Sequence, residues 1–280
     1  MNALTIFLKY ARYRYIIYRL FLRIKMGKKK RDDYLTKIRS SPIDFLPERS
    51  YVLDCGAKAI PRRWTRDFAM LFVTREQDIV SNLTMKENET FVDVGANVGA
   101  YTLMIANNYK TKRVKVIAIE PHPENYAALC RNIVLNSFRN VKTINKAASD
   151  HKGFNSLYER SHDGIRVDSE LYSLCNGAVL DQCNVIHPKG KALQLECDTL
   201  DNMLVNERAD VIKMDVEGAE VLALKGAANV LSKVRKIIVE VHGDNLRFVE
   251  RILREHDFDT AFIDKDMSHI MGSKTFHNEI

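Results

Sequence analysis

The chain has 280 residues, of which 46% are hydrophobic, so it can bury one sizeable core and little more than one domain with appendages. Its five cysteines are odd in number and include no C-x-x-C pair, which argues against a disulfide framework and a zinc cluster. We therefore expect a soluble globular protein in a reducing, cytosolic setting, and the net charge of +7 excludes little because it belongs to one end.

The basic charge lies at the amino end. Residues 1–31 hold ten Lys or Arg and no acid, and the remainder, with 33 basic against 36 acidic residues, carries a net charge of −3. Apolar and aromatic residues recur there at spacings of three and four, which on a helix form one stripe. These residues are Ile6, Tyr10, Tyr13, Ile17, Leu20 and Ile24.

The same stretch is a poor membrane span, because basic residues interrupt every apolar run short of the ~20 residues that a span needs. It also lacks the cleavage site of a secretory signal. Two interpretations remain: a helix in the interface of an anionic membrane, which would place a cytoplasmic protein at the inner membrane face, or a helix docked on the protein's own surface. Binding of nucleic acid by this stretch is a weaker third.

Three segments are predicted along the chain. Residues 1–50 form the basic amphipathic helix and a charged linker that contains Pro42 and Pro47. Residues 51–89 form a lead-in segment with a helix near 76–83. Residues 90–280 form the main domain.

Strands and helices alternate in the main domain. Strands are predicted over 90–94, 115–119, 141–148, 210–214, 236–241 and, as the last, 260–263, and helices over 99–108, 123–136, 219–232 and 246–256. This alternation predicts an α/β fold with a mostly parallel sheet covered on both faces. It fails at about 153–194, which we interpret as an insertion. Ligands of open sheets lie beyond the carboxyl ends of the strands, so this insertion is well placed to cover a substrate.

The stretch "FVDVGANVGAYTL", residues 91–103, predicts a ligand turn between the first strand and its helix. In the dinucleotide fingerprint G-x-G-x-x-G, the second glycine lets the backbone approach a pyrophosphate. Gly95 matches the first glycine, but Asn97 occupies the second position and Gly99 comes one residue early. The turn therefore disfavours a pyrophosphate and favours a nucleoside ligand without phosphates.

Two acidic residues narrow the identity of the predicted ligand. Glu120 ends the next strand, 25 residues after Gly95, where a carboxylate can accept hydrogen bonds from both ribose hydroxyls. Asp93 adds a carboxylate beside the turn, which suits a cationic amine better than a phosphate. Together these features describe S-adenosylmethionine. The alternative is a tight strand-to-helix turn with two solvent-facing acids.

Five stretches carry a resemblance to a known family: "FVDVGANVGAYTL", "AIEPHPENYAALCRNIVLN", "KAASD", "DVIKMDVEGAEVLALKGAANVL" and "IIVEVH". In this order and spacing they resemble the FkbM family of S-adenosylmethionine-dependent methyltransferases, from about residue 67 to about residue 264. The resemblance implies a Rossmann-like class I methyltransferase fold with seven strands and helices on both faces. It also implies O-methylation of a hydroxyl on a sugar, a glycolipid or a related natural product.

The resemblance also implies site residues. Those matching the family's cofactor site are Asp93, Gly95, Ala96, Asn97, Gly99, Glu120, Pro121, Ala148 and Ser149, with Ala148 and Ser149 at positions that flank the adenine. Asp215 and Glu217, in "MDVEG", resemble the acidic motif that faces the transferring methyl group.

Methyl transfer to an alcohol needs alignment of donor and acceptor and a base for the hydroxyl proton. The fourth and fifth strands should be neighbours, and each ends with ionisable groups two residues apart: Asp215 with Glu217, and Glu240 with His242. Asp215 is the first candidate for the base or orienting group. His242 is the second, because its ordinary pKa suits proton transfer near neutrality.

Several alternatives stay open. Glu217 could simply cap the following helix, and two carboxylates with a histidine could hold a divalent cation, although no ligand spacing demands one and we expect no metal. A nucleic-acid methyltransferase is the first competing function, but 215–218 reads D-V-E-G where enzymes acting on base amino groups have an Asn/Asp-Pro-Pro-aromatic motif. A non-catalytic, membrane-associated binding module is the second, and the intact acids of the turn and of the fourth strand argue against it.

Overall fold

The computed structural model describes residues 48–62, 65, 67–71, 76–159, 172–174, 193–264 and 268–274. The predicted amino-terminal helix over 1–31, most of the predicted linker and the middle of the predicted insertion lie outside the described residues, so those expectations stay predictions. Within the described segments, no helix has the length and apolar character needed to cross a bilayer.

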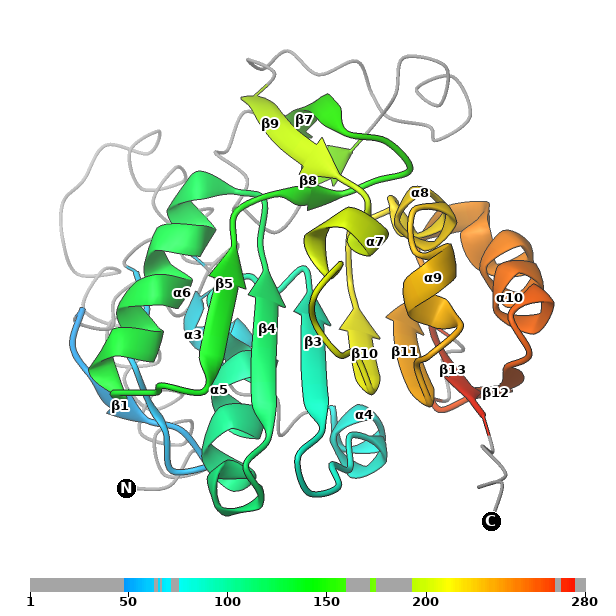
Figure 1. Cartoon of the computed structure of the whole chain (residues 1–280). Coiled ribbons are helices and arrows are strands. Elements are labelled where there is room, and N and C mark those ends of the chain that lie inside the picture. The colour runs from blue at the N-terminus through cyan, green and yellow to red at the C-terminus, as the bar shows by residue number, and fades with distance from the viewer. Residues whose placement is uncertain are drawn as a thin grey trace, which may run out of the picture.

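A seven-stranded sheet forms the centre of the fold (Figure 1). In spatial order its strands are β12 (Asp259–Phe262), β13 (His269–Ser273), β11 (Lys236–Glu240), β10 (Val211–Met214), β3 (Thr90–Val94), β4 (Lys115–Ile119) and β5 (Val141–Ile144). β13 runs antiparallel to both neighbours, and the other strands share one direction. The expected mostly parallel sheet is confirmed. β10 pairs with β11, so the two strands that end in the predicted catalytic residues are neighbours, as expected.

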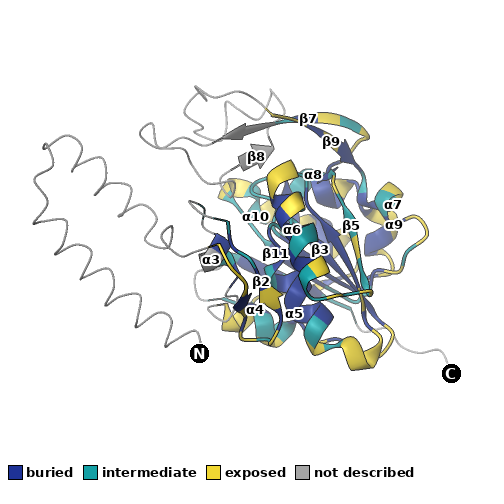
Figure 2. Ribbon diagram, turned by 90° about the vertical axis from the view of Figure 1, so that its left-hand side faces the viewer, coloured by how far each residue is buried: buried dark blue, intermediate teal, exposed yellow. Residues whose placement is uncertain are grey.

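Helices cover both faces of the sheet, and because side chains alternate along each strand, neighbouring residues pack against different helices. Val92 and Val94 pack in a cluster with residues of α7 (Leu200–Met203), α8 (Glu220–Lys225), α9 (Ala228–Leu231) and α10 (Leu246–Glu255). Phe91 points to the opposite side, where α4 (Gln77–Asn82) and α5 (Ala100–Asn108) pack, with α6 (Pro123–Leu135) beside α5. Figure 2 shows that the sheet is almost entirely buried between these layers.

The lead-in segment packs in the same core. Its strands β1 (Tyr51–Val52) and β2 (Lys58–Ala59) form an antiparallel hairpin, followed by α3 (Asp67–Met70). Leu53 and Ala59 are buried against Leu129 and Ile133 of α6. Two short 3₁₀ helices, η2 (Lys110–Lys112) and η3 (Gly243–Asn245), complete the connections. The hairpin therefore lies along α6.

The predicted strand 141–148 is wrong in extent. β5 ends at Ile144, and β6 (Ala147–Ala148) belongs to a second sheet, ordered β6-β9-β7-β8. Its other strands are β7 (Gly153–Glu159), β8 (Tyr172–Leu174) and β9 (Leu193–Asp198), which come from the ends of the predicted insertion and from within it. Figure 1 shows this sheet above the carboxyl ends of β3, β4 and β5. Asn145 and Lys146 interrupt the run, because the chain leaves one sheet for the other there.

Two further elements differ from the sequence expectation. The predicted helix 219–232 is broken into α8 and α9 at Gly226, whose Cβ, if it had one, would lie 2.0 Å from the carbonyl oxygen of Ser149. The strand over 260–263 is not the last, because β13 follows it. Gly272 makes β13 a weak sequence signal, and in the structure this residue packs closely, since a Cβ there would lie 3.1 Å from side-chain atoms of Ile237 and Phe258.

Candidate cofactor and acceptor site

The turn between β3 and α5 is held from two sides. Gly95, Asn97 and Gly99 have φ of +82°, +49° and +101°, in the left-handed region. The N–H groups of Gly95 and the next residue donate to the carbonyl of Ile119, at 2.9 and 3.0 Å. On the other side, a Cβ on Gly95 would lie only 1.7 Å from the carbonyl oxygen of Asp215. Gly95 is therefore required by the close approach of the ends of β4 and β10 to the turn.

Three side-chain oxygens at this end of the sheet are buried and have no hydrogen-bond partner among the described residues. They are Asp93 Oδ1, Asn97 Oδ1 and Asp215 Oδ1. All three are acceptors, and those of Asn97 and Asp215 match ligand groups that offer ammonium or hydroxyl hydrogens and not a pyrophosphate, which only accepts. The residues present therefore fit S-adenosylmethionine.

Glu120 lies directly behind the turn, at the end of β4, and is only 4% exposed. Its carboxylate accepts the N–H groups of Asn97 (2.8 Å) and His122 (2.9 Å) and a hydrogen bond from the side chain of Asn125. Burial raises the pKa of Glu120 and these hydrogen bonds lower it, which leaves it at about 7. A carboxylate offers about four acceptor sites, so about one stays open for a ribose hydroxyl, fewer than the two expected.

Asp93 lies beneath the turn and is only 1% exposed. It accepts a hydrogen bond from Thr102 Oγ1 at 2.6 Å, and burial raises its pKa against the opposing effect of Lys213. The Lys213 ammonium lies 3.1 Å from Asp215 Oδ2 and 4.9 Å from the centroid of the Tyr101 ring. Burial lowers the pKa of Lys213, but Asp215 and Asp93 raise it more, so Lys213 stays charged. The position of Asp93 favours electrostatic support of the turn over direct contact with a cofactor amine.

The predicted adenine neighbours lie where the chain enters the second sheet. Ala148 pairs with Asp198 of β9, and the N–H of Ser149 donates to the Asp198 carbonyl at 3.0 Å. Both residues are buried. Pro121 follows Glu120, and its carbonyl accepts a hydrogen bond from Asn145 at 3.0 Å. Contact of Pro121, Ala148 and Ser149 with an adenine stays a prediction.

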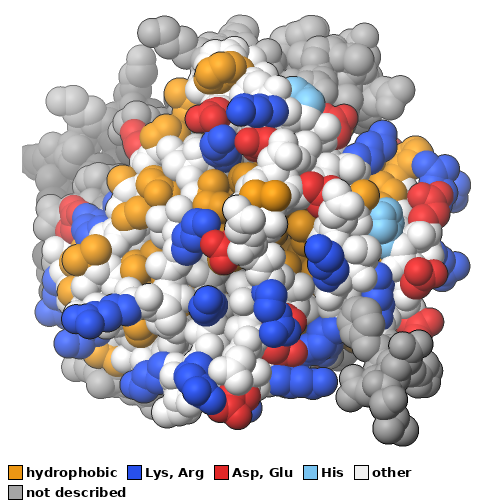
Figure 3. Space-filling model, viewed as in Figure 1, with side chains coloured by type: hydrophobic (Ala, Val, Ile, Leu, Met, Phe, Trp, Pro, Cys, Tyr) orange, Lys and Arg blue, Asp and Glu red, His pale blue; other side chains and the backbone are white. Residues whose placement is uncertain are grey.

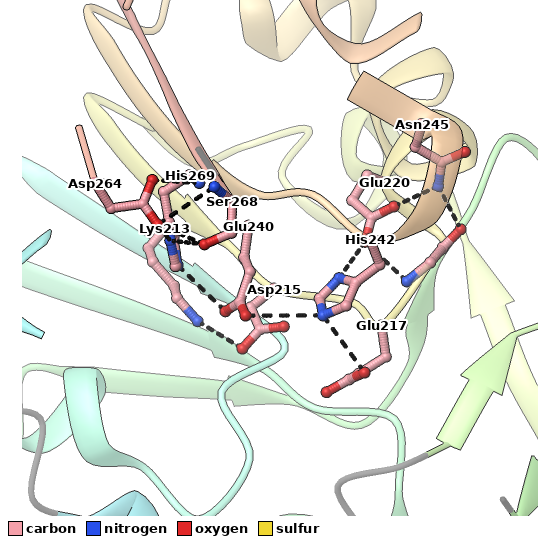
Figure 4. A network of polar contacts seen from close by, with 11 residues as sticks. Lys213, Asp215, Glu217, Glu220, Glu240, His242, Asn245, Asp264, Ser268 and His269 are labelled. Carbon is pink, nitrogen blue, oxygen red and sulfur yellow. Dashed lines mark hydrogen bonds and ion pairs between the residues drawn. The ribbon is translucent and has the colours of Figure 1, made fainter. Parts of the chain in front are cut away.

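The four predicted catalytic side chains converge beyond β10 and β11 (Figure 4). His242 Nε2 lies 3.5 Å from Glu217 Oε2 and 3.7 Å from Glu240 Oε1. One oxygen each of Asp215 and Glu240 and one ring nitrogen of His242 lie within 4.8 Å of one another. Left-handed backbone at Glu217 (φ +49°) and Gly218 (φ +99°) turns the chain after β10. The expected proximity is confirmed, and the catalytic roles stay predictions.

The surroundings of His242 contradict the expectation that it titrates near neutrality. Its Nδ1 lies 2.9 Å from Glu220 Oε1, as a donor to that carboxylate. Burial lowers the pKa of His242, but the hydrogen bond to Glu220 and the charge of Glu217 raise it more, to about 9. At neutral pH His242 is therefore an imidazolium, which can donate to carboxylates but has no lone pair with which to take a proton.

Glu220 is the residue that the sequence reasoning missed most clearly. It is fully buried and accepts hydrogen bonds from His242, from Asn245 Nδ2 (2.6 Å) and from the Gly218 N–H (2.8 Å). An acid in the first turn of a helix is usually a solvated residue that complements the helix dipole. Only the packing of η3 and the β11 end against α8 makes Glu220 the centre of a hydrogen-bond network.

A second histidine, which the sequence analysis did not predict, approaches from β13 (Figure 4). His269 Nε2 lies 3.3 Å from Glu240 Oε2, and its Nδ1 lies 3.1 Å from Asp264 Oδ2. Burial lowers the pKa of His269, but Glu240 and Asp264 raise it more, so the net shift is upward. Glu240 therefore lies between the rings of His242 and His269.

The same cluster has the donor types of a cation site, the alternative that the sequence left open. Carboxylates and an imidazole can ligate a divalent ion. The raised pKa of His242 opposes that use, because a metal ligand must be the neutral ring. Absence of a metal remains our prediction.

Charge on the exterior is mixed. Figure 3 shows acidic and basic side chains interspersed over the face that carries β5, α7 and α9. A nucleic-acid enzyme would instead gather basic side chains along its binding face. On the face shown, the described residues do not form such a basic patch.

The comparisons with known proteins agree with this geometry. The methyltransferase FkbM domain matches residues 93–260. Methyltransferase sdnD of Sordaria araneosa is 29% identical over 212 residues, which cover 62% of this chain and 75% of that protein. Hexuronic acid methyltransferase AglP of Haloferax volcanii is 24% identical over 209 residues, which cover 71% of this chain and 77% of that protein.

Among solved structures, a methyltransferase FkbM from Methylobacillus flagellatus KT is similar with a TM-score of 0.45 and 19% identity. The match covers 69% of this chain and 46% of that one, so this chain spans less than half of the solved protein.

Proposed function

The chain belongs to the FkbM family of S-adenosylmethionine-dependent methyltransferases, and from this premise we propose that it methylates a hydroxyl of a sugar, a glycolipid or a related natural product. The acceptor class is supported by the similarity to a protein named for its action on hexuronic acid. It is also supported by the acceptor-rich end of the sheet, where carboxylates of Asp215, Glu217 and Glu240 gather. Hydroxyl groups donate to carboxylates, and a polyol offers several such donors.

S-adenosylmethionine supplies an activated methyl group on its sulfonium, so the protein mainly has to align donor and acceptor. Glu120 would hold the ribose through its open acceptor site. The buried oxygen of Asn97 would meet a donor group of the methionyl part. Asp93 and Lys213 would hold the turn and the end of β10 together beneath the ligand.

Asp215 is the residue that carries the proposal. Lys213 donates to Asp215 Oδ2 at 3.1 Å, which fixes the carboxylate and leaves Oδ1 without a partner among the described residues. That oxygen is the candidate to accept the hydroxyl proton or to orient the hydroxyl. His242, already protonated, would hold Glu217 and Glu240 around the acceptor and would not act as the base. This revises the second role that the sequence suggested.

Labelling tests the acceptor class. Lysate of a gene-deletion strain is incubated with tritiated S-adenosylmethionine and the purified full-length protein, and the label is followed into glycan, lipid-linked sugar and nucleic-acid fractions. We expect glycosidase-sensitive label. Nuclease-sensitive label would support the nucleic-acid alternative, and a complete lack of transfer would support the non-catalytic one.

A matched pair of variants tests the role of Asp215. Asp215→Asn should lower transfer by about 100-fold or more, the usual range for loss of a general base, and leave affinity for S-adenosylhomocysteine within about threefold. Asp244→Asn makes the same change at an exposed position of η3 and should retain activity. Full transfer by Asp215→Asn would remove Asp215 from the mechanism.

We also propose that residues 1–31 bring the enzyme to an anionic membrane surface from the cytoplasmic side. Their ten basic residues and apolar stripe support this association. Flotation with phosphatidylglycerol vesicles should recover the full chain but not a variant in which Arg12, Arg19 and Arg23 are Gln. Failure of both proteins to float would favour the docked helix.

A further inference from the structure

A chain of buried polar groups connects the lead-in segment to the acid behind the cofactor turn. Arg62 donates to both oxygens of Asp67, with Nε 2.8 Å from Oδ2 and Nη2 2.7 Å from Oδ1. The same Nη2 donates to Asn125 Oδ1 at 2.8 Å. The side chain of Asn125 in turn donates to Glu120. Side-chain exposure along this chain is low, at 16% for Arg62 and 2% for Asp67, and Asn125 as a residue is 2% exposed.

The hydrogen-bonding chemistry of Arg62 and Glu120 fixes the orientation of the Asn125 amide between them. A guanidinium only donates and a carboxylate only accepts. Asn125 can satisfy both only with its oxygen toward Arg62 and its NH₂ toward Glu120, because the flipped amide would place donor against donor and acceptor against acceptor. Asp67 holds the guanidinium bidentately, the geometry in which such pairs are strongest. Arg62 and Glu120 therefore require the same amide orientation, and Arg62 holds the Asn125 side chain in it from the end away from Glu120.

A second bridge runs parallel to the first. Asn132, about two turns further along the same face of α6, accepts the N–H of Ile60 at 2.9 Å and donates to the carbonyl of Val98, in the cofactor turn, at 3.0 Å. It is fully buried. Two asparagines of α6 thus connect residues 60–62 to the two walls of the cofactor site, the β3–α5 turn and the end of β4. The hydrogen bonds of residues 58–62 reach that site through these two asparagines, and Ala59 also packs in one cluster with Ala96 and Val98 of the turn.

We infer that Arg62, clamped by Asp67, is a positioning residue for cofactor binding: it orients Asn125 so that Glu120 presents its open carboxylate site to the ribose. This inference rests on the proposed ribose contact of Glu120. It makes the lead-in segment part of the cofactor-binding machinery, although it lies outside the strands and helices that carry the sequence motifs.

Binding of S-adenosylhomocysteine and of its 2′,3′-dideoxy analogue, measured by calorimetry, tests the inference without any acceptor. The main variant combines Arg62→Met with Asp67→Leu, because removing one partner of a buried ion pair would leave the other charge buried and unpaired. Asn125→Leu breaks the same chain from its other end and serves if the first variant does not fold. Arg131→Met is the matched control, since Arg131 donates to the carbonyl of Ile60 at 2.8 Å and lies outside the chain to Glu120.

The wild type should prefer S-adenosylhomocysteine over the dideoxy analogue. Each test variant should lose about tenfold in affinity for S-adenosylhomocysteine, the usual size of one lost hydrogen bond to a charged group, and less than about twofold for the analogue. Because Asn125 stabilises the ionised carboxylate, the pH midpoint of binding should also rise above its wild-type value. Arg131→Met should change neither the preference nor the midpoint.

Two results overturn the inference in distinguishable ways. If the test variants lose equal affinity for both ligands at an unchanged pH midpoint, the chain is structural and does not position Glu120, and the ribose assignment stands. If the wild type binds both ligands equally, Glu120 does not contact the ribose, and the proposed cofactor contact fails together with the inference.

Discussion

Gly95 and Gly56 offer a controlled test of how the cofactor turn is built. Their φ values are +82° and +84°, so an alanine meets nearly the same backbone strain at each position, about 1 kcal/mol. Their surroundings differ. A Cβ at Gly95 would lie 1.7 Å from the backbone oxygen of Asp215, whereas one at Gly56 would meet only the side-chain amide of Asn107, at 3.4 Å.

The contact at Gly95 cannot be relieved by a side-chain rotation, because the position of a Cβ is fixed by the backbone and its partner is the backbone oxygen of Asp215. The turn and the end of β10 must separate by more than an ångström, and overpacking of this kind costs about 1–3 kcal/mol beyond the strain. Gly95→Ala should therefore lower the free energy of unfolding by about 2–4 kcal/mol, and Gly56→Ala by about 1 kcal/mol. A displacement of that size at a ligand site can cost about 100-fold in function.

Urea unfolding and calorimetric titration with S-adenosylhomocysteine measure both consequences. We expect Gly95→Ala to fold but to bind at least tenfold more weakly, a shift of about 1.4 kcal/mol, and Gly56→Ala to bind like the wild type. Equal stability losses and unchanged binding in both variants would refute the reasoning, since the approach of Asp215 to Gly95 would then carry no cost.

Three further outcomes are expected. The His242 imidazole should titrate near pH 9 when it is followed by NMR. Because its pKa is raised in the folded state, its contribution to the free energy of unfolding is complete below about pH 6.5 and is lost as the pH rises through 9. An NMR midpoint near pH 6.5 would contradict this. Glu89→Ala should lower the free energy of unfolding by about 1–3 kcal/mol and leave cofactor affinity unchanged, because it removes the ion-pair partner of the partly buried Arg235 far from the site. Lys213→Met should also lower the free energy of unfolding measured with urea, and adding Asp93→Asn should recover part of that loss. No recovery would show that the buried Asp93 carboxylate does not need the Lys213 ammonium nearby.

Local patterns were sufficient for the central sheet and for the cofactor turn. The strands 90–94 and 115–119 match β3 and β4, because continuous apolar runs bounded by turn residues identify buried parallel strands. Asn97 and Glu120 lie together, with the Asn97 N–H donating to the carboxylate at 2.8 Å, because successive parallel strands end at one edge. The convergence of Asp215 and His242 followed from the same rule.

The elements that the sequence pattern predicted wrongly are those where contacts between distant residues override local propensity. β13 has a glycine and few strand formers, yet pairing on both sides holds it in the sheet. Gly226 interrupts a helical run because the Ser149 carbonyl, remote in sequence, packs against it. Propensity describes a segment in isolation, and tertiary packing decides such cases.

The sequence by itself determined the family, the methyl donor and the residues at the strand ends. These follow from the motifs and from the alternation of strand and helix patterns along the chain. Tertiary structure alone decided the protonation of His242, the burial of Glu220 and the chain from Arg62 to Glu120. Each of these depends on desolvation and on partners brought together from separate elements, and neither is encoded in residue spacing.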